Sequence, residues 1–253
     1  MVFGWPLWMH RLASPPHFYA LAGQLHRWFY WPALLCMAVS LYGGLVVAPA
    51  DYQQGDAYRI IYVHVPSAYL SMLTYMVMAL AGGIGLVWRL KLAHAVAIAA
   101  APVGASFTFL ALVTGALWGQ PMWGTWWVWD ARLTSELVLL FLYFGFMLLH
   151  GSFDDVGRAD RAAAVLGLVG IVNIPIIHYS VVWWATLHQG PTISKFDNPS
   201  ITMDMLWPLL GMILGFTLYF MAIVTRRVQA EVLLRERQSR WAEDLAATGV
   251  RSR

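Results

Sequence analysis

The sequence between positions 118 and 135 reads Trp118-Gly-Gln-Pro-Met-Trp123-Gly-Thr-Trp126-Trp127-Val-Trp129-Asp130-Ala-Arg132-Leu-Thr134-Ser135. It places five tryptophans within twelve residues, with two glycines and one proline among them. Because glycine and proline both disfavour helix interiors, we expect no long regular helix here. Indole surface on this scale is poorly accommodated by open water. The stretch therefore predicts a folded aromatic platform that faces either lipid headgroups or a flat apolar ligand.

The rest of the chain is apolar enough to lie in a membrane. Of its 253 residues, 60% are hydrophobic and 11% are charged, whereas about 25% of the residues in a soluble domain are charged. Six apolar runs each approach the roughly 20 residues that cross the hydrocarbon core. They follow a polar and aromatic lead, residues 1–28, and cover about residues 29–49, 60–88, 95–117, 133–149, 162–184 and 205–225. The sequence predicts an all-α integral membrane protein, with six transmembrane helices in one domain over residues 1–253 and no nucleic-acid partner.

Lysine and arginine are distributed unequally between the two sides of this arrangement. If both termini share one side, that side carries thirteen of the sixteen basic residues and the other carries three. The positive-inside rule then predicts cytoplasmic termini and a periplasmic tryptophan-rich loop, about residues 118–135. The charged tail, about residues 226–253, is expected to begin with a basic amphipathic helix over residues 226–241 at the membrane surface.

Two histidines flank the tryptophan-rich loop on its predicted side of the membrane. His64 lies where the first outer loop enters the second span, and His188 lies just beyond the fifth span. They form a candidate haem site, because iron accepts two axial imidazoles and a flat macrocycle needs apolar and aromatic faces. Haem propionates need cationic or hydroxyl partners. The nearby candidates for that role are Arg59, Arg132, Thr134 and Ser135.

Each of these features also has a purely structural interpretation. Tryptophans at a membrane surface usually form an aromatic belt, and an interfacial histidine is more often a hydrogen-bonded structural residue. Belt tryptophans are normally scattered over several helix ends, whereas five occupy one loop here. That clustering, with two histidines on the same side, shifts the interpretation towards a ligand surface.

Other polar and aromatic residues near the loop have open roles. His178 lies inside the fifth span, where an ionisable group is a functional candidate. It precedes His188 by ten residues, about 15 Å along a continuous helix, so we interpret it as packing beside the site or supporting a ligand. Asp130 is a candidate helix N-cap, a partner for Arg132, or an acceptor for a ligating imidazole. Glu136 could pair with Arg132. Further candidate neighbours of the ligand are Trp183 and Trp184.

At these residues the chain resembles the CcmC family, the haem-delivery membrane proteins of bacterial cytochrome c maturation. The run from Trp123 to Thr134 looks like the WWD signature of haem-handling proteins. The likeness covers nearly the whole chain, including Tyr58-Arg-Ile-Ile-Tyr-Val-His64-Val-Pro66 and Asn173-Ile-Pro-Ile-Ile-His178-Tyr-Ser180. Related proteins with the same signature are larger and have more spans, so a chain of six spans favours CcmC.

The resemblance implies a specific activity. His64 and His188 would be the axial ligands of a transiently held haem b, and the loop would hold the porphyrin at the outer face of the bacterial inner membrane. The loop residues concerned are Trp118, Trp123, Gly124, Trp126, Trp127, Trp129 and Asp130. The implied partners are the haem chaperone CcmE, the ABC transporter subunits CcmA and CcmB, and the small membrane protein CcmD. The sequence has no G-x-x-x-x-G-K-[ST] motif, so the chain is not the ATPase, and we expect a haem-transfer protein rather than an enzyme.

Three other functions remain open at this point. A membrane b-type cytochrome would need histidine pairs deep in the bilayer, where only His178 lies, and quinol-coupled haem reduction would favour it. A haem transporter would need polar groups along several spans, and transport by the chain alone in vesicles would favour it. A purely structural scaffold would keep its function after the loop tryptophans are replaced.

Overall fold

The structure is a computed structural model that describes residues 14–188 and 201–251. Six of its helical segments are long and apolar enough to cross a membrane, which confirms the predicted all-α multi-pass architecture. The elements in order are α2 (Pro15–Tyr42), the π-helical η1 (Gly43–Val47), the 3₁₀ turn η2 (Asp56–Ile60), α3 (Ile61–Trp88), α4 (Lys91–Trp123), α5 (Ala131–Gly151), α6 (Val156–Gly170), α7 (Asn173–Trp183), α8 (Met203–Arg235) and α9 (Arg240–Arg251).

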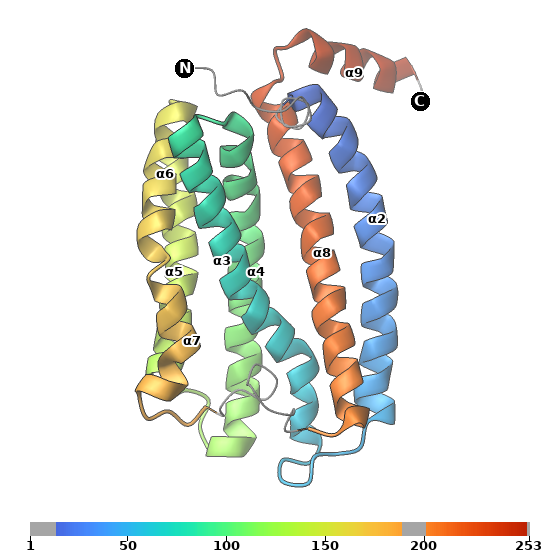
Figure 1. Ribbon diagram of the computed structural model, residues 1–253, viewed down its shortest axis with the longest axis vertical. Coiled ribbons are helices and arrows are strands. Elements are labelled where there is room, and N and C mark those ends of the chain that lie inside the picture. The colour runs from blue at the N-terminus through green and yellow to red at the C-terminus, as the bar shows by residue number, and fades with distance from the viewer. Residues whose placement is uncertain (1–13, 189–200, 252–253) are drawn as a thin grey trace.

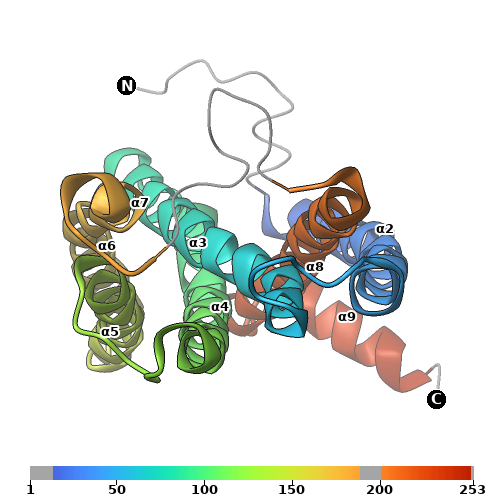
Figure 2. The same ribbon diagram turned by 90° about the horizontal axis from the view of Figure 1, so that it is seen from below.

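The spans form two groups with α3 and α4 between them. Figure 1 shows α2 beside α8 on one side and α5 beside α6 and α7 on the other. The view from below in Figure 2 keeps this order. The start of α2 and the end of α8 lie at one end of the bundle, which we call the terminal end. The end of α4 and the loop before η2 lie at the opposite end, which we call the loop end (Figure 1).

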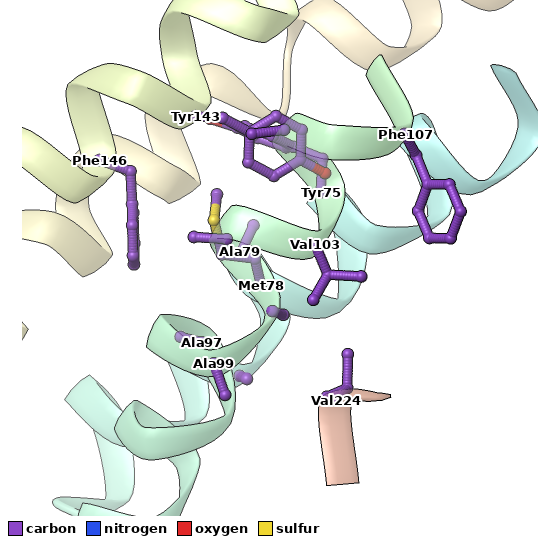
Figure 3. Packing of buried hydrophobic residues seen from close by; sticks show 14 of the residues in the cluster. Tyr75, Met78, Ala79, Ala97, Ala99, Val103, Phe107, Tyr143, Phe146 and Val224 are labelled. Carbon is purple, nitrogen blue, oxygen red and sulfur yellow. The ribbon is translucent and has the colours of Figure 1, made fainter. Parts of the chain in front are cut away.

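The core lies where α3, α4, α5 and α8 meet. A run of buried alanines on α4 lets the neighbouring helices approach closely; it includes Ala95, Ala97, Ala99, Ala100, Ala101 and Ala105. Tyr75 of α3 and Tyr143 of α5 meet edge to face, with 5.2 Å between ring centroids (Figure 3). The Tyr143 hydroxyl also donates to the Ser71 carbonyl at 2.7 Å. The tyrosine contacts join α3 to α5, and the small residues of α4 let that helix pack against both.

The tryptophan-rich stretch is partly helical, contrary to the expectation for it. α4 continues through Trp118 and Pro121 to Trp123. Because Pro121 lies in the last turn, its missing N–H removes a single hydrogen bond. The helix ends at Gly124, whose φ of 75° is the left-handed conformation that glycine adopts without strain and whose N–H donates to Gln120 O at 3.0 Å. Residues 124–130 are non-helical, as predicted.

Both the first and the last span are longer than predicted. α2 begins at Pro15, not near residue 29, since proline is well tolerated in the first helical turn, where its missing N–H has no partner to lose. α8 runs unbroken to Arg235, so the separate helix predicted over residues 226–241 is wrong. The amphipathic helix of the tail is instead α9, whose Trp241 contacts the Tyr19 ring at 5.6 Å.

The fifth span is interrupted, which the apolar run did not predict. It begins at Val156, because Asp155 caps the helix by accepting a hydrogen bond from the Arg158 amide at 2.7 Å. The helix is broken at residues 171–172, between α6 and α7. Pro175 has no N–H to donate to the carbonyl of Ile171, which accounts for a break at this point. The span predicted over residues 162–184 is therefore confirmed as a candidate membrane span, Val156–Trp183, but it consists of two helices rather than one.

Candidate functional site

His64 lies in the first turn of α3 and is held by α4. Its Nδ1 atom is 3.0 Å from the hydroxyl oxygen of Thr114. That hydroxyl already donates to the Leu110 carbonyl at 2.7 Å, so it accepts the proton on His64 Nδ1. The Nε2 atom of His64 is then unprotonated, which is the form of imidazole that ligates a metal.

A glycine allows this close approach of α3 to α4. A Cβ atom on Gly115 would lie 3.1 Å from Cε1 of the His64 ring, closer than ordinary van der Waals contact. The ring is 8% exposed. Gly115 therefore makes room for the imidazole one position after the threonine that orients it.

Trp118 forms a second wall against His64. Its ring meets the imidazole nearly perpendicular, at a centroid distance of 5.6 Å, and meets Tyr58 in the same way at 5.8 Å. Its Nε1 donates to Gln54 Oε1 at 2.9 Å. The loop before η2 thus locks the first tryptophan of the stretch against the first histidine.

His188 reaches the same place from the other side of the bundle. It follows α7 in a non-helical segment, and its backbone N–H donates to Thr186 Oγ1 at 3.1 Å. Its ring centroid is 6.1 Å from that of His64 and 5.9 Å from that of Trp123. Burial, together with smaller effects of the Arg132 charge and of the neighbouring His64, lowers the pKa of His188 to about 3. His188 is therefore a neutral imidazole at physiological pH.

The spacing of the two histidines suits one iron between them. An iron–nitrogen bond of about 2 Å and a further distance of about 1 Å from nitrogen to ring centroid place two trans axial imidazoles roughly 6 Å apart. The observed centroid distance is 6.1 Å. No cluster of three or more His, Cys, Asp or Glu side chains occurs in the described part of the chain. A pair of histidines suits a haem, whose iron already has four porphyrin ligands, better than a bare zinc ion, which takes four ligands.

Several buried polar atoms in the tryptophan-rich loop, in α5 and in His188 itself have no hydrogen-bond partner among the described residues. Within residues 14–188 and 201–251 they include Trp127 Nε1, Asp130 Oδ2, Glu136 Oε1 and His188 Nδ1. Buried polar atoms in proteins are nearly always hydrogen-bonded to protein or to water, so these atoms are available to water or to a ligand. Four more such atoms lie in other residues of the described chain: Tyr62 Oη, Thr74 Oγ1, Tyr75 Oη and Trp241 Nε1.

The cavity beside the histidines is small and partly open. Its volume is about 50 Å³, and it is lined by Gln54, Gly115, Trp118, Met122, Trp123 and His188. Pockets that enclose a drug-sized ligand have volumes of roughly 300 Å³ or more. The cavity seen beside the histidines is therefore too small to enclose a macrocycle by itself.

The tryptophans of the loop differ in their surroundings, since some contact the histidines and others are exposed. Trp118 and Trp123 contact the histidines, whereas Trp126 and Trp129 are 58% and 74% exposed. Trp127 packs edge to face on Trp129 at 5.3 Å. The five indoles thus form an inner wall and an outer rim, rather than one flat platform.

Asp130 ends the loop and begins α5. Its Oδ1 accepts a hydrogen bond from the Leu133 amide at 2.8 Å, which confirms the interpretation as an N-cap. The same cap orients the first turn of α5, which carries Arg132.

The candidate propionate partners differ in how they are placed. Arg132 Nη1 lies 3.4 Å from Ile177 O, and its charge acts on His188. Arg59 is already bound to Gly44 O and Ala48 O, at 2.6 and 2.9 Å, and to Asp56. The Ser135 hydroxyl is buried and donates to Ala131 O at 2.6 Å. Thr134 is partly exposed on the same turn. Arg132 is therefore the best placed of the four.

Three other predicted residues are not brought to the site. The His178 side chain is exposed on α7 and contacts the Tyr179 ring at 4.8 Å, which does not support a packing role inside the bundle. Trp183 and Trp184 are 55% and 49% exposed, and Trp183 stacks on Tyr179. In the described chain none of the three shows a contact with His64 or His188. Trp183 and Trp184 instead have the exposure expected of interfacial aromatic residues.

Glu136 is a buried residue of α5. It is 8% exposed, and the expected ion pair with Arg132 is not seen among the described residues.

Sequence reasoning missed the residues that orient the site. These residues are Thr114, Gln54, Gly115 and Met122. Thr114 lies four residues before Trp118, so both occupy one face of α4. That spacing was the available signal, whereas the Gln54 contact depends on how the outer loop folds.

Comparison with known proteins shows the family of the chain. A family model described as CcmC, heme exporter protein C, matches residues 8–243. The chain is 52% identical over 237 residues to heme exporter protein C of Escherichia coli K12, covering 94% of this chain and 96% of that protein. It is 48% identical over 241 residues to the protein of the same name from Haemophilus influenzae, covering 95% and 98%. A putative cytochrome c biosynthesis ccmC-like mitochondrial protein of Marchantia polymorpha is 45% identical over 194 residues, covering 76% of this chain and 82% of that protein. The chain therefore belongs to the CcmC family.

Proposed function

We propose that this protein binds haem b transiently between His64 and His188, at the face of the membrane predicted to be periplasmic, and passes it to the haem chaperone CcmE. The observation that carries the proposal is the 6.1 Å separation of two imidazole centroids from distant segments, beside Trp118 and Trp123. The names of the relatives, heme exporter protein C and a cytochrome c biosynthesis protein, support a role in haem handling.

Each part of the site has a role in this proposal. Thr114 holds the proton of His64 on Nδ1, so that Nε2 faces the ligand. Trp118 and Trp123 provide apolar contact for the porphyrin, and Arg132 provides a cation for a propionate. The haem is the cargo of this protein, and the residues supply binding and orientation, not a chemical reaction.

The shallow site also suits release. His188 lies on a non-helical segment rather than on a span, and Trp126 and Trp129 are exposed beside it. A surface site of this kind keeps much of the macrocycle accessible to a second protein. We propose that the exposed rim of the loop is the surface that CcmE approaches, and that CcmA, CcmB and CcmD assemble around the same membrane protein in the bacterial inner membrane.

The absorption spectrum of the purified, haem-loaded protein tests the binding step. We expect a six-coordinate, bis-imidazole spectrum that is lost in His64→Ala and in His188→Ala. His178→Ala is the matched control, because it removes an exposed imidazole from the same half of the protein. If both ligand variants keep the wild-type spectrum, the bis-histidine site is wrong.

Covalent haem on co-expressed CcmE tests the delivery step separately. We expect Trp129→Ala to reduce chaperone loading while the protein keeps its own haem spectrum. Normal loading of CcmE by the Trp126→Ala/Trp129→Ala variant would contradict the proposed role of the exposed rim, and would leave the histidine site in place.

A further inference from the structure

A second cavity lies between α2 and α8, toward the terminal end. Its volume is about 470 Å³, much larger than the cavity beside the histidines, and its lining is mainly polar. The lining residues are Tyr19, Ala20, Gly23, Gln24, His26, Arg27, Arg226 and Gln229. Two arginines from different helices face one space, and among the described residues that line it there is no carboxylate to neutralise them.

One of these arginines is held in place by a buried amide. Arg226 Nη1 donates to Gln229 Oε1 at 2.6 Å, and Gln229 Nε2 in turn donates to Tyr19 O at 2.9 Å. Gln229 is only 5% exposed. The guanidinium is therefore positioned by α2 and α8 together, and it keeps further N–H donors for a ligand, since a guanidinium has five.

The depth of the cavity corresponds to the headgroup region of a bilayer. The first span, Pro15–Val47, and α8 each contain 33 helical residues, which is about 50 Å at 1.5 Å per residue, whereas the hydrocarbon core is about 30 Å thick. The first turns of α2 and the last turns of α8 therefore extend beyond the hydrocarbon. Trp28 and Trp31, 75% and 67% exposed, follow Arg27 on α2, where interfacial tryptophans are expected.

We propose that this cavity binds the phosphate headgroup of an anionic phospholipid from the leaflet on the side of the terminal end. Arg27 and Arg226 bind the phosphate oxygens, and the acyl chains lie along the apolar surface of α2 beyond Trp28. Basic pockets between transmembrane helices at this depth suit such headgroups. The site is separate from the histidine pair, which lies at the loop end of the bundle.

Native mass spectrometry of the delipidated full-length protein tests this proposal. We expect saturable 1:1 binding of phosphatidylglycerol, much weaker binding of phosphatidylcholine, and no competition from millimolar inorganic phosphate. Each arginine near an anionic surface contributes about fivefold to affinity, so Arg27→Gln and Arg226→Gln should each weaken binding about fivefold and the double variant about 25-fold. Arg158→Gln is the matched control, because it removes an exposed arginine at the same end but outside the cavity, and it should bind as the wild type does.

Three results would overturn the proposal. Equal binding of phosphatidylglycerol by the double variant and the wild type would show that the arginines do not form the site. An equal loss in Arg158→Gln would show a general charge effect. Displacement of the lipid by inorganic phosphate alone would identify a site for free phosphate instead. Gel filtration establishes that each variant is folded, and the single variants provide the test if the double variant is not.

Discussion

The two ends of the bundle differ in how their buried carboxylate and imidazole groups are paired. At the terminal end, Asp160 accepts two hydrogen bonds from Arg235, at 2.8 and 2.9 Å, and lies 3.2 Å from His150 Nε2. Arg235 also pairs with Glu231 at 2.7 Å. At the loop end, Asp130 Oδ2, Glu136 Oε1 and His188 Nδ1 are buried without partners in the described chain. The ion pairs at the terminal end join α6 to α8, although Trp241 Nε1 of α9 is also unpaired there among the described residues, whereas the loop end has buried carboxylate and imidazole atoms that a ligand can contact.

The largest expected effect comes from breaking the ion pairs of the terminal end. Asp160→Ala should destabilise the protein by roughly 3 kcal/mol, because Arg235 loses two hydrogen bonds to a charged partner and keeps, among the described residues, only Glu231 as a counter-charge. Thermal unfolding in detergent measures this loss. Glu231→Gln, which leaves the Asp160–Arg235 pair intact, should cost far less. Haem affinity of the folded fraction should not change, and a parallel loss of haem binding would show that the two ends are coupled.

The next effect is on the orientation of His64. Thr114→Val removes the hydroxyl that accepts the Nδ1 proton while keeping the shape of the side chain. Loss of the hydrogen-bond partner of a ligating histidine typically lowers metal affinity about 10–100-fold, and we expect a loss of haem affinity in that range. Haem titration followed by absorption measures it. Thr108→Val is the control, because Thr108 is a buried threonine of the same helix that donates to Gly104 O; unchanged affinity in Thr114→Val would remove its assigned role.

Two substitutions of Asp130 distinguish its role as a helix cap from a role in ligand binding. Asp130→Ala should lower the free energy of unfolding by about 1 kcal/mol, the usual value of an N-cap. Asp130→Asn should restore most of that stability, since its amide oxygen also accepts from the Leu133 amide. If Asp130→Asn restores stability and haem binding together, the carboxylate charge has no separate role; if only stability returns, the unpaired Oδ2 contributes to the ligand site.

The smallest effect tests the close approach of α3 and α4. Gly115→Ala should raise helix stability by about 0.5–1 kcal/mol yet weaken haem binding a few-fold, because its methyl group displaces the His64 ring. Thermal unfolding and haem titration on the same preparation show whether stability rises while haem affinity falls. Gly151→Ala, where nothing lies within 4 Å of the new Cβ atom, is the control. Unchanged haem affinity in Gly115→Ala would mean that the imidazole has room to move.

The fold was largely readable from the sequence, and the errors share one cause. Six apolar runs are a strong signal, since an apolar segment of sufficient length has few alternatives to a membrane helix. The boundaries failed where polar residues continue a helix beyond the hydrocarbon, as at Pro15 and from Arg226 to Arg235. The same reasoning expected Trp118 to lie in a loop, although α4 continues to Trp123. Hydropathy identifies the part of a helix that lies in the membrane, and it does not predict how far the helix continues outside the membrane.

The sequence by itself determined the class of the protein, the two histidines and the aromatic loop between them, because these depend on composition and on residue type. Only the tertiary structure decided that His64 and His188 meet, that Thr114 sets the tautomer of His64, and that His178 faces outward. The positions of those side chains depend on helix packing and on the conformation of non-helical segments, namely the loop that contains Gln54 and residues 184–188. Such contacts join residues far apart in the chain, and local sequence patterns do not encode the geometry with which they come together.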